Sequence, residues 1–222
     1  AVDESQWRNS RYRLGQRYDY YDSRVRLADA YVGFSPGLRG RFTRRYTVGL
    51  RVDESRFAPD PDGTTLGPLP ADRVLRHPYL RFDLITDEFR KVSNHDQIAR
   101  TEDLQFGLNA TVLAGWSSRG LGADRDALLL DSAFGYGWSF GADHDLFASL
   151  GLRGRLEDGS ALDTRWHVEA SWYWNTSPHT LLHVRATHDA GERLDLDHYF
   201  ELGGDNGLRG YPDRFVNGDG GT

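Results

Sequence analysis

Cysteine, methionine and long hydrophobic runs are all absent from this chain of 222 residues. The longest purely aliphatic stretch, residues 127–130, is far shorter than the about 20 apolar residues that a transmembrane helix needs. A mean hydropathy of −0.63 and a net charge of −6 resemble the values of a soluble acidic protein. A membrane-spanning β-strand, however, needs apolar residues on only one of its sides, so these averages leave a transmembrane barrel open.

The motifs of common enzymes are also missing. The chain has no Gly-x-Ser-x-Gly nucleophile motif, no phosphate-binding loop and no His-Glu-x-x-His zinc motif, so we expect neither enzymatic activity nor a cofactor. His167, His183 and Glu169 share one face of neighbouring strands, where a hydrated polar wall explains them better than a metal site. Arginine and acidic residues are interspersed without a basic stripe, which argues against nucleic acid as a partner.

Aromatic residues and glycine are abundant, with 6 Trp, 11 Tyr, 11 Phe and 25 Gly. This combination is typical of many strands joined by tight turns. Apolar and polar residues alternate with period two in one stretch after another, and these stretches of about 10–14 residues have the length of tilted membrane strands. The predicted fold is all-β: a transmembrane antiparallel β-barrel, or a part of one, with about ten strands.

The alternation predicts which side chains face lipid and which face the barrel lumen, because a one-residue slip would exchange the two sets. The residues predicted to face lipid are Leu104, Phe106, Leu108, Val112, Trp166, Val168, Trp172, Leu182 and Val184. Those predicted to face the lumen include Gln105 and Asn109. A polar lumenal wall is predicted from Arg153, Arg155, Arg165, His167, Glu169 and Arg185.

Three other stretches complete the predicted topology. Residues 12–20 and 25–34 are interpreted as two strands, and residues 196–202 as the last strand. Residues 56–77 are too rich in proline and glycine for a strand and form the longest predicted connector. Counting strands backwards from residue 202 places this connector at the opposite end of the barrel from the loop that follows that residue.

That loop contains the most informative motif, in which Gly203 and Gly204 precede Leu208-Arg209-Gly210-Tyr211. The motif resembles the [Val/Ile/Leu]-Arg-Gly-[Phe/Tyr] signature of the BamA/TamA-like bacterial surface antigen superfamily of outer-membrane barrels. The resemblance implies that an extracellular loop folds back into the lumen and that Arg209 is the arginine that meets acidic and aromatic groups there. It also implies insertion or translocation of proteins at a Gram-negative-type outer membrane, with the lipid bilayer and client polypeptides as partners.

Two other functions remain open: a passive porin-like channel, and the membrane anchor of a lipase-like enzyme that lies upstream. All 222 residues are interpreted as part of one barrel domain that ends in the motif-bearing loop. The superfamily has further strands after this loop, so we expect a curved open sheet or a barrel with missing strands.

Overall fold

The computed structural model describes residues 1–63, 65–93, 100–141, 143–177, 180–204 and 209–218. In these ranges the chain forms strands, turns and a single 3-10 turn at Arg119–Leu121. No helix in the described ranges is long and apolar enough to cross a membrane.

One 10-stranded antiparallel sheet contains most of the chain, and its long strands follow one another in sequence order. They are β1 (Val2–Arg13), β2 (Gln16–Phe34), β4 (Phe42–Pro59), β5 (Arg73–Thr86), β8 (Gly107–Ser117), β9 (Ala127–Phe140), β10 (His144–Glu157), β11 (Ser160–Ser177) and β12 (Thr180–Glu192), while β3 (Leu38–Arg39) pairs with β4. Two small hairpins stand apart: β6 (Phe89–Ser93) with β7 (Thr101–Gln105), and β13 (Phe200–Leu202) with β14 (Val216–Gly218).

Two-residue turns explain how neighbouring strands stay in register. Leu14 and Gly15 have φ angles of 52° and 77°, and Asp158 and Gly159 have 47° and 76°. Two successive positive φ angles match the twist of the strands on either side, which favours such tight hairpins.

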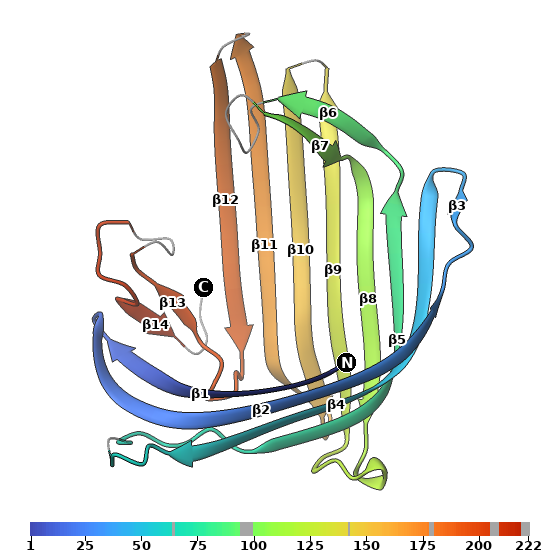
Figure 1. Cartoon of the computed structure of the whole chain (residues 1–222). Helices are drawn as coiled ribbons and strands as arrows, with labels where there is room; N and C mark the ends of the chain where they lie inside the picture. Colours follow the sequence, from blue (N-terminus) through green and yellow to red (C-terminus); the bar gives the residue numbers. More distant parts are fainter. Residues whose placement is uncertain (64, 94–99, 142, 178–179, 205–208, 219–222) are drawn as a thin grey trace.

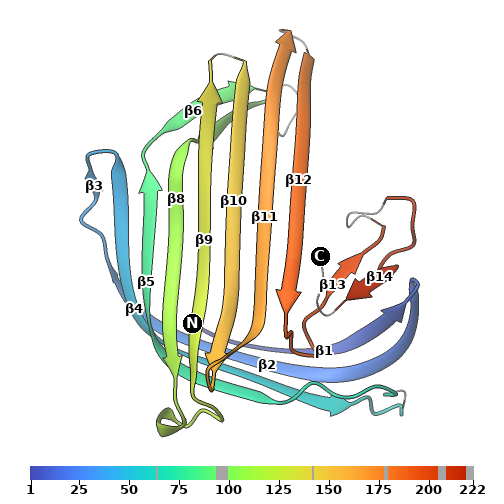
Figure 2. The same cartoon turned by 180° about the vertical axis from the view of Figure 1, so that it is seen from behind.

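The sheet is strongly curved and open (Figures 1 and 2). β8 to β12 form an upright wall, and β1, β2 and β4 sweep round its lower end. β1 and β12 are the two edges, and within the described ranges they are not paired with each other. The expected all-β antiparallel sheet of about ten strands is therefore confirmed, and the described residues form no closed barrel.

The register separates two faces. The hollow side carries the odd-numbered residues of β8 to β12, such as Asn109, Arg165, Glu169 and Arg185. In β11 this holds for the residues after a bulge near residue 163. The even-numbered residues, including Val112, lie on the outer side, as the alternation predicts. The outer side also holds Leu108, Trp166, Val168, Trp172, Leu182 and Val184. We call these the concave face and the convex face.

Phe106 is a correction to this prediction. The sequence places it on the lipid side of one strand over residues 103–116, but this stretch is divided between β7 and β8. Gly107, with a φ of 74°, breaks the alternation. Phe106 is 1% exposed, and its ring lies 5.1 Å from that of Phe147, which is on the concave face. Leu104 belongs to the separate β6–β7 hairpin.

Three predicted boundaries are also wrong. Residues 12–20 straddle the turn between β1 and β2 and do not form one strand. The connector predicted at residues 56–77 is shorter, because β4 extends to Pro59 and β5 begins at Arg73. Residues 196–202 add no strand to the large sheet, since only Phe200–Leu202 is a strand and it pairs with β14. The prediction that the connector lies at the opposite end from the loop after residue 202 counted residues 196–202 as a strand of the barrel. Because they are not, the connector 60–72 and the segment after β12 lie at the same end of the sheet.

Candidate functional site: the two faces of the sheet and the segment docked on the concave face

The convex face carries a wide apolar band. Large side chains that remain exposed there are Val32, Phe34, Tyr46, Val48, Leu50, Leu80, Trp116, Leu128, Leu130, Phe134, Tyr136, Trp138, Phe140, Leu150, Val168, Trp174, Leu182 and Val184. In residues 28–34, 46–52, 78–84, 108–116, 128–140, 144–156, 166–174 and 182–190, all of which are described, the convex positions include no Asp, Glu, Lys or Arg. Exposed apolar patches of this extent mark contact with a membrane or another protein.

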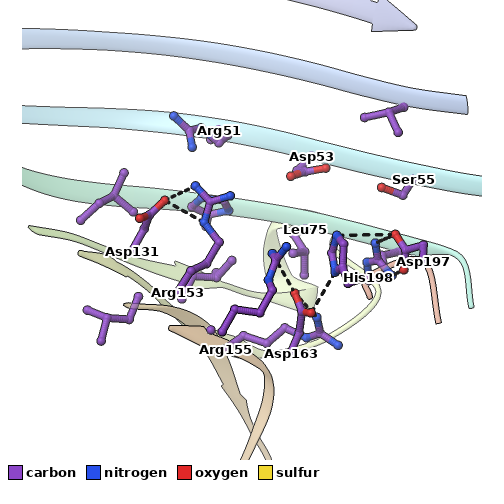
Figure 3. A pocket seen from close by; sticks show the side chains of 18 residues that line it. Arg51, Asp53, Ser55, Leu75, Asp131, Arg153, Arg155, Asp163, Asp197 and His198 are labelled. Atoms are coloured by element: carbon purple, nitrogen blue, oxygen red, sulfur yellow. Dashed lines mark hydrogen bonds and ion pairs between the residues drawn. The ribbon is translucent and has the colours of Figure 1, made fainter. Parts of the chain in front are cut away.

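The concave face is polar, and its charged side chains form ion pairs between neighbouring strands. Arg185 of β12 donates to Glu169 of β11 at 2.6 Å, and His167 shares a hydrogen bond of 2.7 Å with Asp189. Arg153 of β10 pairs with Asp131 of β9 (Figure 3). The structure thus places the six residues of the predicted lumenal wall on one face and gives each a carboxylate or cationic partner.

The segment after β12, residues 193–199, lies on this concave face and is held by two arginines. Arg73 of β5 donates two hydrogen bonds to the carboxylate of Asp197, at 2.8 and 2.6 Å. Arg155 of β10 donates two to Asp195, at 2.5 and 2.7 Å. Such two-pronged contacts match the planar guanidinium to the planar carboxylate and are among the strongest hydrogen bonds in proteins.

A second layer of charged groups supports the two arginines. The side chain of Arg155 is 7% exposed and also contacts Glu157 and Asp163. Asp163 occupies a bulge in β11, with a φ of 46°, and accepts a hydrogen bond of 2.8 Å from the ring of His198 if that nitrogen is protonated. Figure 3 shows Asp163 between Arg155 and His198, beside a cavity of about 310 Å³.

These contacts determine the pKa values of the two carboxyl groups in the docked segment. Burial raises the pKa of Asp195 and Asp197, but the hydrogen bonds and charges of Arg155 and Arg73 outweigh burial, so each pKa lies below its ordinary value. Unfolded aspartate has a pKa of about 3.9. The ion pairs therefore stabilise docking fully above about pH 4 and are lost as the pH falls through the lower, folded-state pKa values.

We therefore predict that the segment undocks in acid. A spin label on Leu196→Cys, at a side chain that is 50% exposed, should be immobile at pH 7 and become mobile as the pH falls below the lowered pKa values of Asp195 and Asp197, as followed by electron paramagnetic resonance in an acid titration. The natural chain has no cysteine, so the label is unique. In an Asp195→Asn/Asp197→Asn background the label should be mobile at every pH. A label that is immobile at pH 7 in the Asp195→Asn/Asp197→Asn background would show that the ion pairs do not hold the segment.

A metal ion does not fit this cluster. Asp163, Asp195 and His198 place ligand atoms within 4.8 Å of one another. Arginines already occupy the same carboxylates, since Arg155 pairs with Asp195 and Arg165 lies 3.3 Å from Asp163. A cation would have to displace these guanidinium groups, so we assign the cluster to ion pairing.

The Arg-Gly-Tyr motif lies at the end of the β13–β14 hairpin. The Gly204 N–H donates to the Tyr211 carbonyl at 3.1 Å and closes the loop, in which Gly203, Gly204 and Gly210 have positive φ angles. Arg209 is exposed and makes no ion pair in the part of the chain that the structure describes. Leu208 lies outside the described residues. The lumenal contact expected for Arg209 stays a prediction.

The sequence predicts only some of the residues that hold the segment. Arg155 is in the predicted lumenal wall, but Arg73 is in the stretch interpreted as a connector, Asp195 is next to the strand predicted at residues 196–202, and Asp197 is inside it. The only sequence signal for their pairing is opposite charge. No family model, curated protein or solved structure matches this chain.

Proposed function

We propose that this chain forms part of the wall of a transmembrane β-barrel in a Gram-negative-type outer membrane, and that the barrel inserts or translocates polypeptides. The observation that carries the membrane part is the convex face, which is free of Asp, Glu, Lys and Arg over the ranges given above on eight neighbouring strands. A soluble sheet would cover such a face with another layer, whereas lipid can face it directly.

The height of the apolar band suits a bilayer. Residues 128–140 of β9 extend about 40 Å at about 3.3 Å per residue. A tilt of about 45° reduces the height to about 28 Å, close to the about 25 Å apolar band of outer-membrane barrels. Aromatic rings at one end of the wall, Tyr136, Trp138, Trp172 and Trp174, lie near one another as in an interfacial girdle.

The concave face supports the polypeptide part of the proposal. It already holds a segment of polypeptide, residues 193–199, through side-chain ion pairs and one backbone bond to the Arg193 carbonyl, without pairing it into the sheet. The resemblance of residues 208–211 to the surface antigen signature points to the same function. A passive channel would also have a polar lumen, and the next experiment separates the two.

The test is an assembly assay with the protein reconstituted in phospholipid vesicles. An unfolded outer-membrane barrel is added, and its folding is followed by the change in its gel mobility before heating. We expect faster folding than with empty vesicles, and about tenfold slower assembly for Arg209→Lys, which corresponds to an activation free energy higher by about 1.4 kcal/mol. The planar fork of arginine can contact carboxylates and aromatic faces that a lysine ammonium matches poorly.

Arg214→Lys is the matched control, because Arg214 is in the same hairpin but lies over the Tyr12 ring at 4.6 Å. It should assemble the client nearly as fast as the natural protein. Ion conductance without faster client folding would favour the porin-like channel. If Arg209→Lys and Arg209→Ala both retain full activity, the motif is an ordinary surface loop.

A further inference from the structure

We propose that Arg73 and Arg155 form a binding site for acidic turns of client polypeptides, and that the chain's own residues 195–198 occupy this site here. The identity of the ligand as a client rests on the proposed function. The ligand chemistry comes from the site: two carboxylates two residues apart, presented by one tight turn.

The occupant shows the geometry that the site accepts. The His198 N–H donates to the Asp195 carbonyl at 2.8 Å, which closes a turn with Asp195 first and Asp197 third. Both carboxylates point to the wall, where each meets one two-pronged arginine. Arg73 also reaches Asp195 at 3.1 Å, so the two arginines act together on the pair.

Residues 194–199 are attached to the sheet in a way that allows another polypeptide to replace them. Residues 194–199 belong to no strand, and the described backbone bond from this region to the large sheet runs from Asp163 N–H to the Arg193 carbonyl at 2.8 Å. A client turn can therefore reproduce the side-chain contacts without breaking a strand ladder.

When the segment leaves, Arg73 and Arg155 are left in place to bind another carboxylate. Within the described ranges both ion pairs of Arg73 are with the segment, to Asp195 and Asp197. Arg73 is 7% exposed as a residue with the segment docked, and departure of the segment would leave its guanidinium without a carboxylate partner among the described residues. Arg155 keeps Glu157 and Asp163, which hold its guanidinium in place.

The adjoining cavity adds room and positive charge. Its lining includes five arginines from the large sheet, Arg51, Arg73, Arg153, Arg155 and Arg165, against three aspartates of that sheet, Asp53, Asp131 and Asp163. Asp197 and His198 line it from the segment, so undocking removes a carboxylate from this surface. The emptied surface therefore favours an anionic group on the incoming chain.

The test uses a fluorescent, end-blocked peptide with the sequence of residues 193–199, Arg-Leu-Asp-Leu-Asp-His-Tyr, and a control peptide with both aspartates replaced by asparagine. Binding is measured by fluorescence anisotropy to the whole protein in detergent micelles. The Asp195→Asn/Asp197→Asn variant should bind the aspartate peptide at least about tenfold more tightly than the natural protein, in which the segment competes. Adding Arg73→Gln to that variant should abolish binding, whereas adding Arg185→Gln, at an arginine of the concave face outside the lining of this cavity, should leave it unchanged.

Three results would overturn the proposal. They are equal binding of the aspartate and asparagine peptides, binding that persists with Arg73→Gln, and no binding of the aspartate peptide to the Asp195→Asn/Asp197→Asn variant. If that variant does not fold, the spin label at Leu196→Cys replaces it: the aspartate peptide should mobilise the label and the asparagine peptide should not. An aspartate peptide that leaves the label immobile would overturn the proposal as well. Peptide binding together with failure of the assembly assay would refute the proposed function and leave this site standing.

Discussion

Val168→Arg is expected to destabilise the membrane-inserted protein by about 2–4 kcal/mol, because it places a charge near the middle of the apolar band. Val168 lies at the centre of β11 on the convex face and is 41% exposed. If water covered this face, a substitution at so exposed a site would change stability by no more than about 0.5 kcal/mol. Urea unfolding of the protein from lipid vesicles measures the difference.

His167→Arg is the matched control, since His167 is the neighbouring residue and faces the opposite side. Its partners there are Asp189 and Glu169, both of which accept a cation. We expect a change within about 0.5 kcal/mol for this variant. Equal changes in the free energy of unfolding for the two substitutions would mean that both faces are exposed to the same solvent, and the membrane proposal would fail.

The faces of the sheet could be predicted from sequence because period-two alternation is a local property of each strand. Residues 165–175 alternate without interruption, and the register confirms their two sides. Phe106 was misplaced because one backbone angle, the positive φ of Gly107, shifts the pattern and leaves no mark in the hydrophobicity of its neighbours.

The docked segment could not be predicted, for a different reason. Asp195, Leu196 and Asp197 alternate in polarity as a strand would, but they lie in a turn whose position is fixed by Arg73 and Arg155. Arg73 lies 124 residues away from Asp197 in the chain. Pairing over such distances depends on the curvature of the whole sheet, which brings β5 and β10 to the same hollow, and no local pattern encodes it.

Arg155→Gln should be the most damaging single change at the site where the segment docks, at up to about 3–5 kcal/mol, because it removes the buried cation that Glu157, Asp163 and Asp195 share and leaves Asp195 with Arg73 and Asp163 with Arg165. Asp163 and Asp195 are 9% and 20% exposed in their side chains, and both contact Arg155. Arg153→Gln is the control on the same strand and face: its side chain is 61% exposed and its partner Asp131 is 40% exposed, so about 0–1 kcal/mol is expected.

A double-mutant cycle assigns the loss to the docked segment. If Arg155 acts mainly through Asp195, the combined Arg155→Gln/Asp195→Asn variant should lose less stability than the sum of the single variants, with a coupling of up to about 3 kcal/mol. Additive losses would instead assign Arg155 to its wall partners, Glu157 and Asp163, and leave the segment only loosely attached. Because Arg155 contacts both the wall and the segment, this cycle decides whether its buried charge fastens the segment or only the sheet beneath it.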